Sequence, residues 1–177
     1  MNTKLATFAV KFGIFRTFAL QFLSMQLLNF ASYAFQVKET MPGSQKYTIF
    51  DPIRKKQVAL TPEEWVRQHV IQYLLTDKQT PKALIGIEVR LMLNDLQKRA
   101  DLVVYSRKNA NPLLLIECKA PHITITQSVF EQIARYNMVL KVPYLMVTNG
   151  ITHHFCYIDF ENQNYTFLTD LPIYDQL

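Results

Sequence analysis

Two carboxylates and one amine stand at the ends of two apolar segments of this 177-residue chain. Asp101 directly precedes the run Leu102-Val103-Val104, while Glu117 and Lys119 close the aliphatic run 113–116. Carboxylates are the ligands that hold Mg²⁺ in proteins, and an ammonium group stabilises negative charge that develops on a phosphate. If the fold brings them together, these residue types indicate either a mutual ion pair or a site for a ligand such as a metal and a phosphate.

Local patterns predict how that could happen. The run 113–119 lies between Asn111-Pro112 and Ala120-Pro121, as is typical of a short central strand covered on both faces. Residues 99–105 predict a second strand, and the polar residues 106–111 predict a hairpin loop. Antiparallel pairing would bring Asp101 beside Glu117. Because side chains alternate along a strand, Glu117 and Lys119 share one face and Cys118 points to the other.

The expected chemistry is hydrolysis of a phosphodiester. Asp101 and Glu117 would hold Mg²⁺, with the Cys118 backbone carbonyl as a third ligand, and Mn²⁺ could substitute. The metal would lower the pKa of its bound water and polarise the phosphate. Lys119 would orient that water and stabilise the developing charge. Arg99 and Arg135 could contact phosphate.

An Asp followed, across a hairpin, by Glu-x-Lys resembles the signature of the PD-(D/E)xK nuclease superfamily. The phrases Lys98–Tyr105 and Leu115–Pro121 resemble more closely the N-terminal nuclease domain of the R subunit of type I restriction enzymes, in a short stand-alone form. The resemblance covers about residues 28–160. It implies a Mg²⁺-dependent endonuclease that acts on DNA, with a protein partner that would supply specificity or translocation. Two departures are the lack of a Pro before Asp101 and the presence of Cys118 where an apolar residue is usual.

The same resemblance implies further site residues. In the family a Glu on the first helix often joins the metal site, and Glu64 is the first candidate, with Glu63 as the other. Capping alone would explain Glu64, because Thr61-Pro62-Glu63-Glu64 has the form of a capping box. Gln132 and Tyr136 resemble the Gln-x-x-x-Tyr motif that helps hold DNA beside the metal; the alternative is a pair packed on the sheet.

The elements that must position these residues predict an α/β (α+β) fold. We expect a restriction-endonuclease-like core, with a central mixed sheet flanked by helices and a small N-terminal antiparallel hairpin. The expected strands are 33–38, 47–50, 56–60, 81–92, 99–105, 112–119, 143–148, 151–160 and 165–168; the expected helices are 61–75 and 124–141; and 170–177 is expected to be a tail.

Two polar groups have open interpretations. Arg54, Lys55 and Lys56 crowd the predicted hairpin tip, either as a solvated edge or as a phosphate contact. Glu88 could approach the site from a neighbouring strand, but we expect it to form an ion pair with Arg90 or Arg99.

Composition sets the class of protein. A hydrophobic fraction of 49% with 19% charged residues is typical of a folded globular chain. The formal charge is +5, but from Met25 onward 16 basic residues face 14 acidic ones, so a DNA-binding function would need a local basic face. The two cysteines, Cys118 and Cys156, form no disulfide framework or zinc motif, which fits a cytoplasmic protein.

Residues 1–24 are treated as an extension separate from a single domain at 25–177. The segment contains Lys4, Lys11 and Arg16 but no acid. It could be a targeting segment, although the cations interrupt its apolar run and no membrane-spanning stretch follows. In the resembling family the chain begins with a sequence like Met25–Phe30. That likeness favours translation from Met25, which would make 1–24 an upstream artefact or a mobile helix.

Two alternatives to an active nuclease remain at this point. The first is a non-catalytic module that keeps the nuclease fold to bind DNA or a partner protein. The second is an unrelated α/β binding protein in which Asp101, Glu117 and Lys119 form a buried ion network.

Overall fold

The computed structural model describes residues 27–44, 46–93, 96–126 and 141–177, together with Phe130, Glu131, Ala134, Asn137 and Leu140. Several sequence predictions lie outside the described residues. These are the extension at 1–24, the start at Met25, and the site residues Gln132, Arg135 and Tyr136. The division of the chain at residue 25 therefore stays a prediction.

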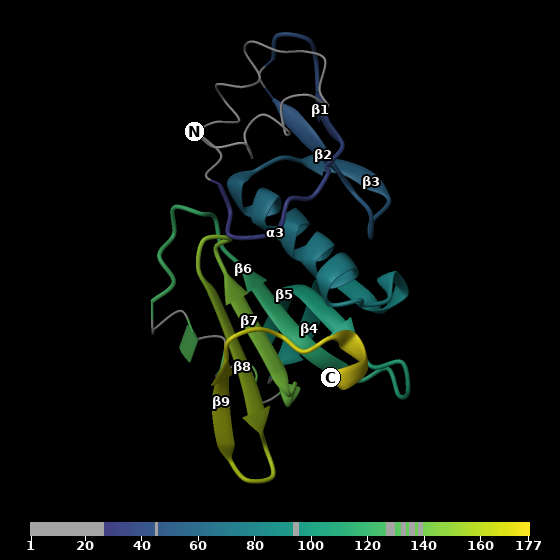
Figure 1. The fold of residues 1–177 in the computed structure, drawn as a ribbon. Coiled ribbons are helices and arrows are strands. Elements are labelled where there is room, and N and C mark those ends of the chain that lie inside the picture. Colours follow the sequence, from purple (N-terminus) through teal and green to yellow (C-terminus); the bar gives the residue numbers. More distant parts are fainter. Residues whose placement is uncertain are drawn as a thin grey trace.

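The described strands form two sheets (Figure 1). A three-stranded antiparallel sheet has the order β1-β2-β3, and a six-stranded mixed sheet has the order β4-β5-β6-β7-β8-β9. The strands are β1 (Val37–Glu39), β2 (Tyr47–Asp51), β3 (Lys56–Ala59), β4 (Ile85–Leu93), β5 (Leu96–Tyr105), β6 (Pro112–Cys118), β7 (Tyr144–Thr148), β8 (His153–Asp159) and β9 (Asn164–Leu168). The predicted α/β (α+β) class, with a mixed sheet and a small N-terminal antiparallel sheet, is confirmed.

The six-stranded sheet is mixed because one crossover connection joins a parallel pair of strands. β6 and β7 run parallel, in the register Leu115↔Leu145, and every other pair in this sheet is antiparallel. A parallel pair needs a long connection, which here runs through a segment whose described positions between Phe130 and Leu140 are helical. The predicted strand–helix–strand order is therefore confirmed for the residues that the structure describes.

Helix α3 (Pro62–Gln72) begins where the sequence predicts. Thr61 is the N-cap, and its side chain accepts a hydrogen bond from the Glu64 backbone N–H at 3.0 Å. The other hydrogen bond of the expected capping box, from the Thr61 backbone N–H to the Glu64 side chain, is not formed. The Glu64 carboxylate binds Arg54, Arg67 and Gln68 instead. After α3 the chain continues into a π-helical turn, Tyr73–Asp77.

The six-stranded sheet is covered on both faces. Val66 and Val70 of α3 pack on one face with Leu102, Ile116 and Met146, all of them fully buried. On the other face, Val103, Leu115, Leu145 and Val147 meet Phe130 and Leu140 of the helical segment. Cys118 is buried in the first of these clusters, as expected for a small core residue.

Three boundary predictions are wrong. The strand expected from residue 33 begins only at Val37, and residues 82–84 of the expected strand 81–92 form a 3₁₀ turn after Pro81. The expected tail at 170–177 instead packs on the core, because Leu171 and Tyr174 are buried and the Tyr174 hydroxyl donates to the Tyr105 carbonyl at 3.1 Å. Within the part of the chain that the structure describes, no helix is long and apolar enough to cross a bilayer.

The N-terminal segment from Leu27 is held against α3 by aromatic packing around His69. The His69 ring lies 4.6 Å from that of Phe35, 5.8 Å from that of Phe30 and 4.3 Å from that of Trp65, measured between centroids. His69 Nδ1 lies 2.9 Å from the Trp65 carbonyl, so Nδ1 carries the proton of a neutral ring. Burial in this apolar cluster lowers the pKa of His69 from 6.5 to about 4.

His69 should make the protein less stable in mild acid. In the unfolded chain the imidazole binds a proton near pH 6.5, whereas in the folded protein it resists protonation down to about pH 4. The stability that depends on a neutral His69 is present above pH 6.5 and is lost as the pH falls toward 4. The loss is on the order of 3 kcal/mol. Urea unfolding at several pH values should show a flatter dependence for His69→Phe than for the wild type.

The exposed His122 provides the matched control. His122→Gln should leave the pH dependence of the unfolding free energy unchanged. If His69→Phe keeps the full wild-type dependence between pH 6.5 and 4, the assignment of this dependence to His69 is wrong.

Candidate functional site

The register of β5 and β6 brings Asp101 and Glu117 together. Leu102 pairs with Ile116, so the next residues outward on the two antiparallel strands are Asp101 and Glu117. Side chains at such neighbouring positions have Cβ atoms about 5 Å apart. Asp101 Oδ2 also accepts a hydrogen bond of 2.7 Å from the Cys118 backbone N–H, which fixes the carboxylate at the end of β6.

Lys119 lies on the same side as Glu117, and its Nζ is 2.7 Å from Glu117 Oε1. Burial raises the pKa of Glu117, and the negative charge of Asp101 raises it further, while Lys119 acts in the opposite direction. Burial alone would lower the pKa of Lys119, but its hydrogen bond and charge interaction with Glu117 outweigh burial, so that pKa is raised. The structure therefore brings the three predicted residues into one cluster with coupled charges.

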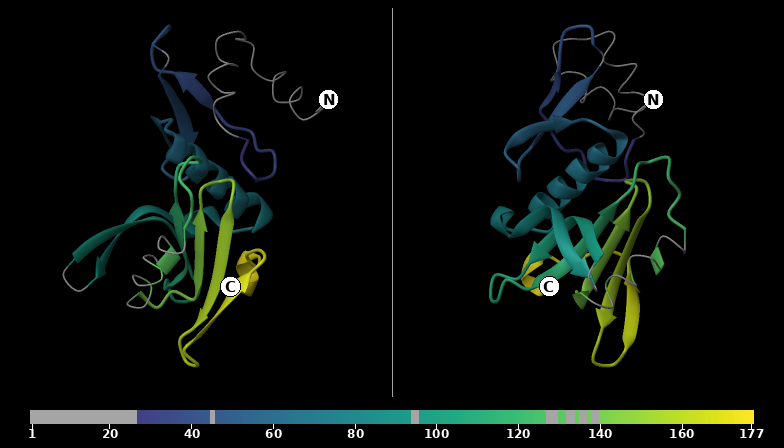
Figure 2. Two further views of the ribbon diagram at one scale, coloured as in Figure 1. Left: turned by 90° about the vertical axis from the view of Figure 1, so that its left-hand side faces the viewer. Right: turned by 180° about the vertical axis from the view of Figure 1, so that it is seen from behind.

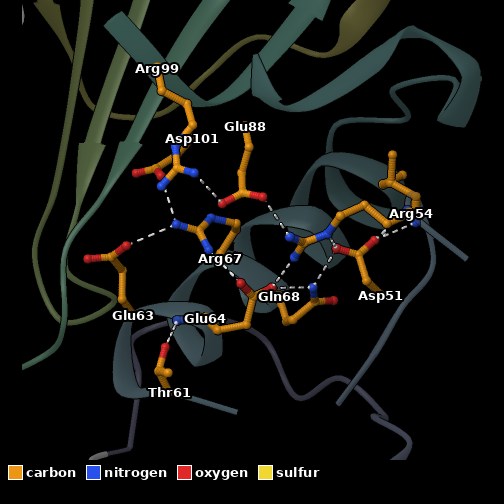
Figure 3. A network of polar contacts seen from close by, with 11 residues as sticks. Asp51, Arg54, Thr61, Glu63, Glu64, Arg67, Gln68, Glu88, Arg99 and Asp101 are labelled. Atoms are coloured by element: carbon orange, nitrogen blue, oxygen red, sulfur yellow. Dashed lines mark hydrogen bonds and ion pairs between the residues drawn. The ribbon is translucent and has the colours of Figure 1, made fainter. Parts of the chain in front are cut away.

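A buried arginine of α3 joins this cluster to the helix (Figure 3). Arg67 Nη2 lies 2.7 Å from Asp101 Oδ1 and 2.9 Å from Glu63 Oε1, and Nη1 lies 2.5 Å from Glu64 Oε2. The side chain of Arg67 is only 6% exposed. Burial by itself lowers the pKa of Arg67, but Asp101 and Glu64 more than compensate, so the guanidinium stays charged.

A second arginine extends the network into the three-stranded sheet. Arg54 lies 2.6 Å from both Asp51 and Glu64 and 3.1 Å from Glu88. Gln68 donates to Asp51 at 3.0 Å and to Glu64 at 2.8 Å. For Arg54, both sequence interpretations of the hairpin tip are wrong, because its guanidinium turns inward and binds carboxylates (Figure 3).

Sequence reasoning missed Arg67, Asp51 and Gln68, and it assigned Arg54 no carboxylate partner. For Arg67 a signal was present, because it stands four residues after Glu63 and three after Glu64, where helical side chains meet. The Arg54–Asp51 and Gln68–Glu64 contacts are local too, three and four residues apart. The contacts of Arg54 with Glu64 and Glu88, and of Gln68 with Asp51, join residues far apart in the chain, and no local pattern indicates them.

Glu88 lies on β4 next to Asp101 and has an unusual backbone. Ile87 pairs with Leu102 and Val89 with Ala100, so Glu88 faces Asp101 across the strand pair without a ladder contact of its own. Its φ of +52° is in the left-handed region, which costs a non-glycine residue about 1 kcal/mol or more. Glu88 Oε1 lies 3.3 Å from Arg99, so the expected ion pair with Arg99 is confirmed.

Negative charge exceeds positive charge in the described network. Six carboxylates (Asp51, Glu63, Glu64, Glu88, Asp101 and Glu117) face four cations (Arg54, Arg67, Arg99 and Lys119). An excess of two negative charges in a partly buried cluster is unfavourable without a counter-ion. The donor set is one that a hard divalent cation prefers.

The two glutamates of the first helical turn have different surroundings. Both carboxylate oxygens of Glu64 bind protein groups, and its side chain is 7% exposed. Glu63 is 45% exposed, and its charge raises the pKa of Glu117, so it faces the cluster. Glu63 is therefore the better placed of the two candidates to join a metal site, although the sequence favoured Glu64.

No group of three His, Cys, Asp or Glu side chains arranged to hold a metal ion is found among the described residues. Arg67 and Lys119 take an oxygen of Asp101 and of Glu117, respectively. Cys118 contributes its backbone N–H to Asp101, while its thiol is buried, which raises the pKa of the thiol. The predicted role of the Cys118 carbonyl as a metal ligand stays a prediction.

The family of this chain follows from a comparison with known protein families. Residues 62–172 match the family model described as "Type I restriction enzyme R protein N terminus". This chain belongs to that family, which confirms the resemblance found in the sequence. The description of the family model names only the N terminus of that protein.

A comparison with solved structures gives a match to the fragment structure of a putative HsdR subunit of a type I restriction enzyme from Vibrio vulnificus YJ016. It is 20% identical, with a TM-score of 0.48, and the match covers 67% of this chain. The chain corresponds to 24% of the length of that structure. Among curated proteins, none matches this chain.

Removing the Arg67 guanidinium should strongly destabilise the protein. Arg67→Met leaves Glu64 and Asp101 without their shared buried counter-ion, and breaking such a pair costs about 3–5 kcal/mol. The loss should appear as a reduced free energy of unfolding in urea at pH 7. Adding Glu64→Gln to Arg67→Met should recover part of it, because one uncompensated charge is removed.

Glu63→Gln is the matched control, since the Glu63 side chain is 45% exposed and water can solvate its end of the ion pair with Arg67. It should change the free energy of unfolding by no more than about 1 kcal/mol. Equal losses for Arg67→Met and Glu63→Gln would contradict the central position of Arg67 in the network.

Proposed function

We propose that this chain is a metal-dependent endonuclease that hydrolyses DNA phosphodiester bonds. The observation that carries the proposal is the convergence of Asp101, Glu117 and Lys119 at the ends of two paired strands. Membership of the R-subunit N-terminal family supports it. The nuclease activity, its substrate and its metal are proposals.

Mg²⁺, with Mn²⁺ as a substitute, suits the chemistry of the donors. Asp101, Glu117 and the Cys118 carbonyl would hold the ion, and Glu63 would add a fourth oxygen donor. The charge excess of the network gives the site a reason to attract a divalent cation. When bound, the ion would polarise the phosphate and lower the pKa of a coordinated water.

The residues of the chain itself have separable tasks. The Cys118 N–H and Arg67 hold the Asp101 carboxylate in one orientation through its two oxygens. Lys119 remains charged beside Glu117, so it can orient an attacking water and stabilise negative charge at the phosphate. Arg99, Gln132, Arg135 and Tyr136 are proposed to position the substrate, the last three on the basis of sequence alone.

Partners and location follow from the family as proposals. The matched region corresponds to the N terminus of a larger enzyme, so DNA would be the substrate and a protein partner would supply specificity or translocation. The two cysteines are free and buried, which suits the reducing environment of a cytoplasmic protein.

A second candidate function is a non-catalytic module that binds DNA or a partner protein. The observation that favours it is that Asp101 already has a protein partner at each oxygen, with Arg67 at one and the Cys118 N–H at the other. In this alternative the network would serve stability alone.

The decisive test is cleavage by the purified protein. With Mg²⁺ or Mn²⁺, the wild type should cut plasmid or single-stranded DNA, and EDTA should stop the reaction. Asp101→Ala and Lys119→Ala should each abolish it, while Lys108→Ala on the remote 106–111 loop should retain it. Gel analysis, with an RNA substrate in parallel, provides the measurement.

A folded wild type that binds DNA but does not cut it with either metal would support the non-catalytic alternative. Cleavage that survives both Asp101→Ala and Lys119→Ala would point to a different site or to a contaminating nuclease.

Substitution of Glu63 and of Glu64 should affect different properties, metal binding for the first and stability for the second. Glu63→Gln should weaken Mn²⁺ binding, measured by calorimetry, and reduce cleavage by on the order of tenfold or more while the unfolding free energy is nearly unchanged. Glu64→Gln should chiefly reduce the unfolding free energy, because it removes the carboxylate charge that Arg54 and Arg67 share. If Glu63→Gln leaves Mn²⁺ affinity at the wild-type value, Glu63 has no part in metal binding.

A further inference from the structure

The β4–β5 hairpin extends past the rest of the mixed sheet. β6 pairs with β5 only from Leu102 to Tyr105, whereas β4 and β5 stay paired as far as Leu93 and Leu96. The two-stranded part, residues 88–93 and 96–100, is called the arm. Figure 2 shows the hairpin projecting away from the other strands. The arm starts beside Asp101, so any long substrate of the site passes close to it.

Two arginines stand directly opposite each other on the arm. Arg90 pairs with Arg99, so their side chains leave the same face of the hairpin. Arg90 is exposed, and the side chain of Arg99 is 63% exposed. Like charges at directly opposed positions destabilise a strand pair. Within the described part of the chain no ion pair is found for Arg90, so folding gives no reason for this arrangement.

The arginine pair is next to the candidate site. Arg99 precedes Asp101 by two residues, a step of about 7 Å along a strand. That step is close to the axial rise of two nucleotides in one strand of a duplex, about 3.4 Å each. Arg99 also lies 3.3 Å from Glu88, the strained residue that faces Asp101, and Glu88 binds Arg54 on its other oxygen (Figure 3).

We propose that the arm is a DNA-binding element in which Arg90 and Arg99 together bind the phosphate backbone beside the cleaved bond. This proposal rests on the proposed nuclease function and adds the surface that holds the substrate. A guanidinium can bind a phosphate through two parallel hydrogen bonds, which suits arginine better than lysine for this task. In the free protein, Glu88 holds Arg99, and a phosphate replaces this half-exposed carboxylate when DNA binds.

The test measures binding without cleavage. A short fluorescent DNA duplex is titrated with the wild type, Arg90→Gln and Arg99→Gln in EDTA and again in Ca²⁺, across a range of salt concentrations. Each variant should bind roughly tenfold more weakly at low salt. Each should also lower the slope of log affinity against log salt by about 0.9, the value for one lost phosphate contact.

Lys108→Gln is the matched control, because Lys108 is exposed on the loop at the other end of β5. It removes one positive charge and should leave both affinity and slope at wild-type values. The melting temperature separates binding from folding: Arg90→Gln should keep or raise it, since the variant relieves repulsion between opposed arginines.

Unchanged affinity and slope in Arg90→Gln and Arg99→Gln would overturn the proposal, as would an equal loss in Lys108→Gln. The proposal would also be overturned if the wild type bound no DNA in either buffer. The same holds if the arm bound poly-L-glutamate, a polyanion without phosphates, as tightly as DNA. If the protein binds DNA through the arm but never cuts it, the DNA-binding role of the arm is supported and the proposed nuclease activity is contradicted. If the protein cuts DNA while both arm variants bind DNA normally, the proposed nuclease activity is supported and the DNA-binding role of the arm is contradicted.

Discussion

The site depends on one buried guanidinium. Arg67 binds carboxylates from its own helix and from β5, so it ties α3 to the sheet where the catalytic candidates lie. Buried charges require such pairing, because an unpaired carboxylate in this environment would be protonated or would destabilise the fold. The positions of Asp101 and Glu64 are therefore set by the same residue, although only one of them faces the cluster with Glu117.

The sequence predicted those parts of the site that follow from local pattern. Breakers around residues 113–119 and the polar loop 106–111 were enough to predict the hairpin. The alternation of side chains along β6 then predicted that Glu117 and Lys119 share one face and that Cys118 points to the opposite, buried face. These inferences worked because register in a hairpin is set by its turn and by which side chains must be buried.

The remaining features arise from contacts between distant segments. Arg54 stands at a hairpin tip, where a cation is normally solvated, and nothing local indicates that it turns toward Glu64 and Glu88. The same limit applies to the choice between Glu63 and Glu64, which have nearly identical sequence surroundings. Their exposure separates them, and exposure depends on how α3 packs against the three-stranded and six-stranded sheets.

Three features of one region work against stability. The network holds more negative than positive charge, Glu88 adopts a left-handed backbone conformation, and Arg90 opposes Arg99. Local preferences and the fold agree at the Thr61 cap and at the apolar faces of the sheet. Positive φ also occurs at Lys55, Gln79, Ala110, Lys141 and Gln163, whereas at Glu88 it lies within a strand. Violations of local rules tend to gather where function requires them, because a site for metal and phosphate needs excess charge of one sign beside exposed charge of the other. Selection for stability alone would remove each violation by a single substitution. An acidic cluster beside two exposed arginines, one of them paired among the described residues only with Glu88, is the arrangement that a cation and a polyanion would together neutralise.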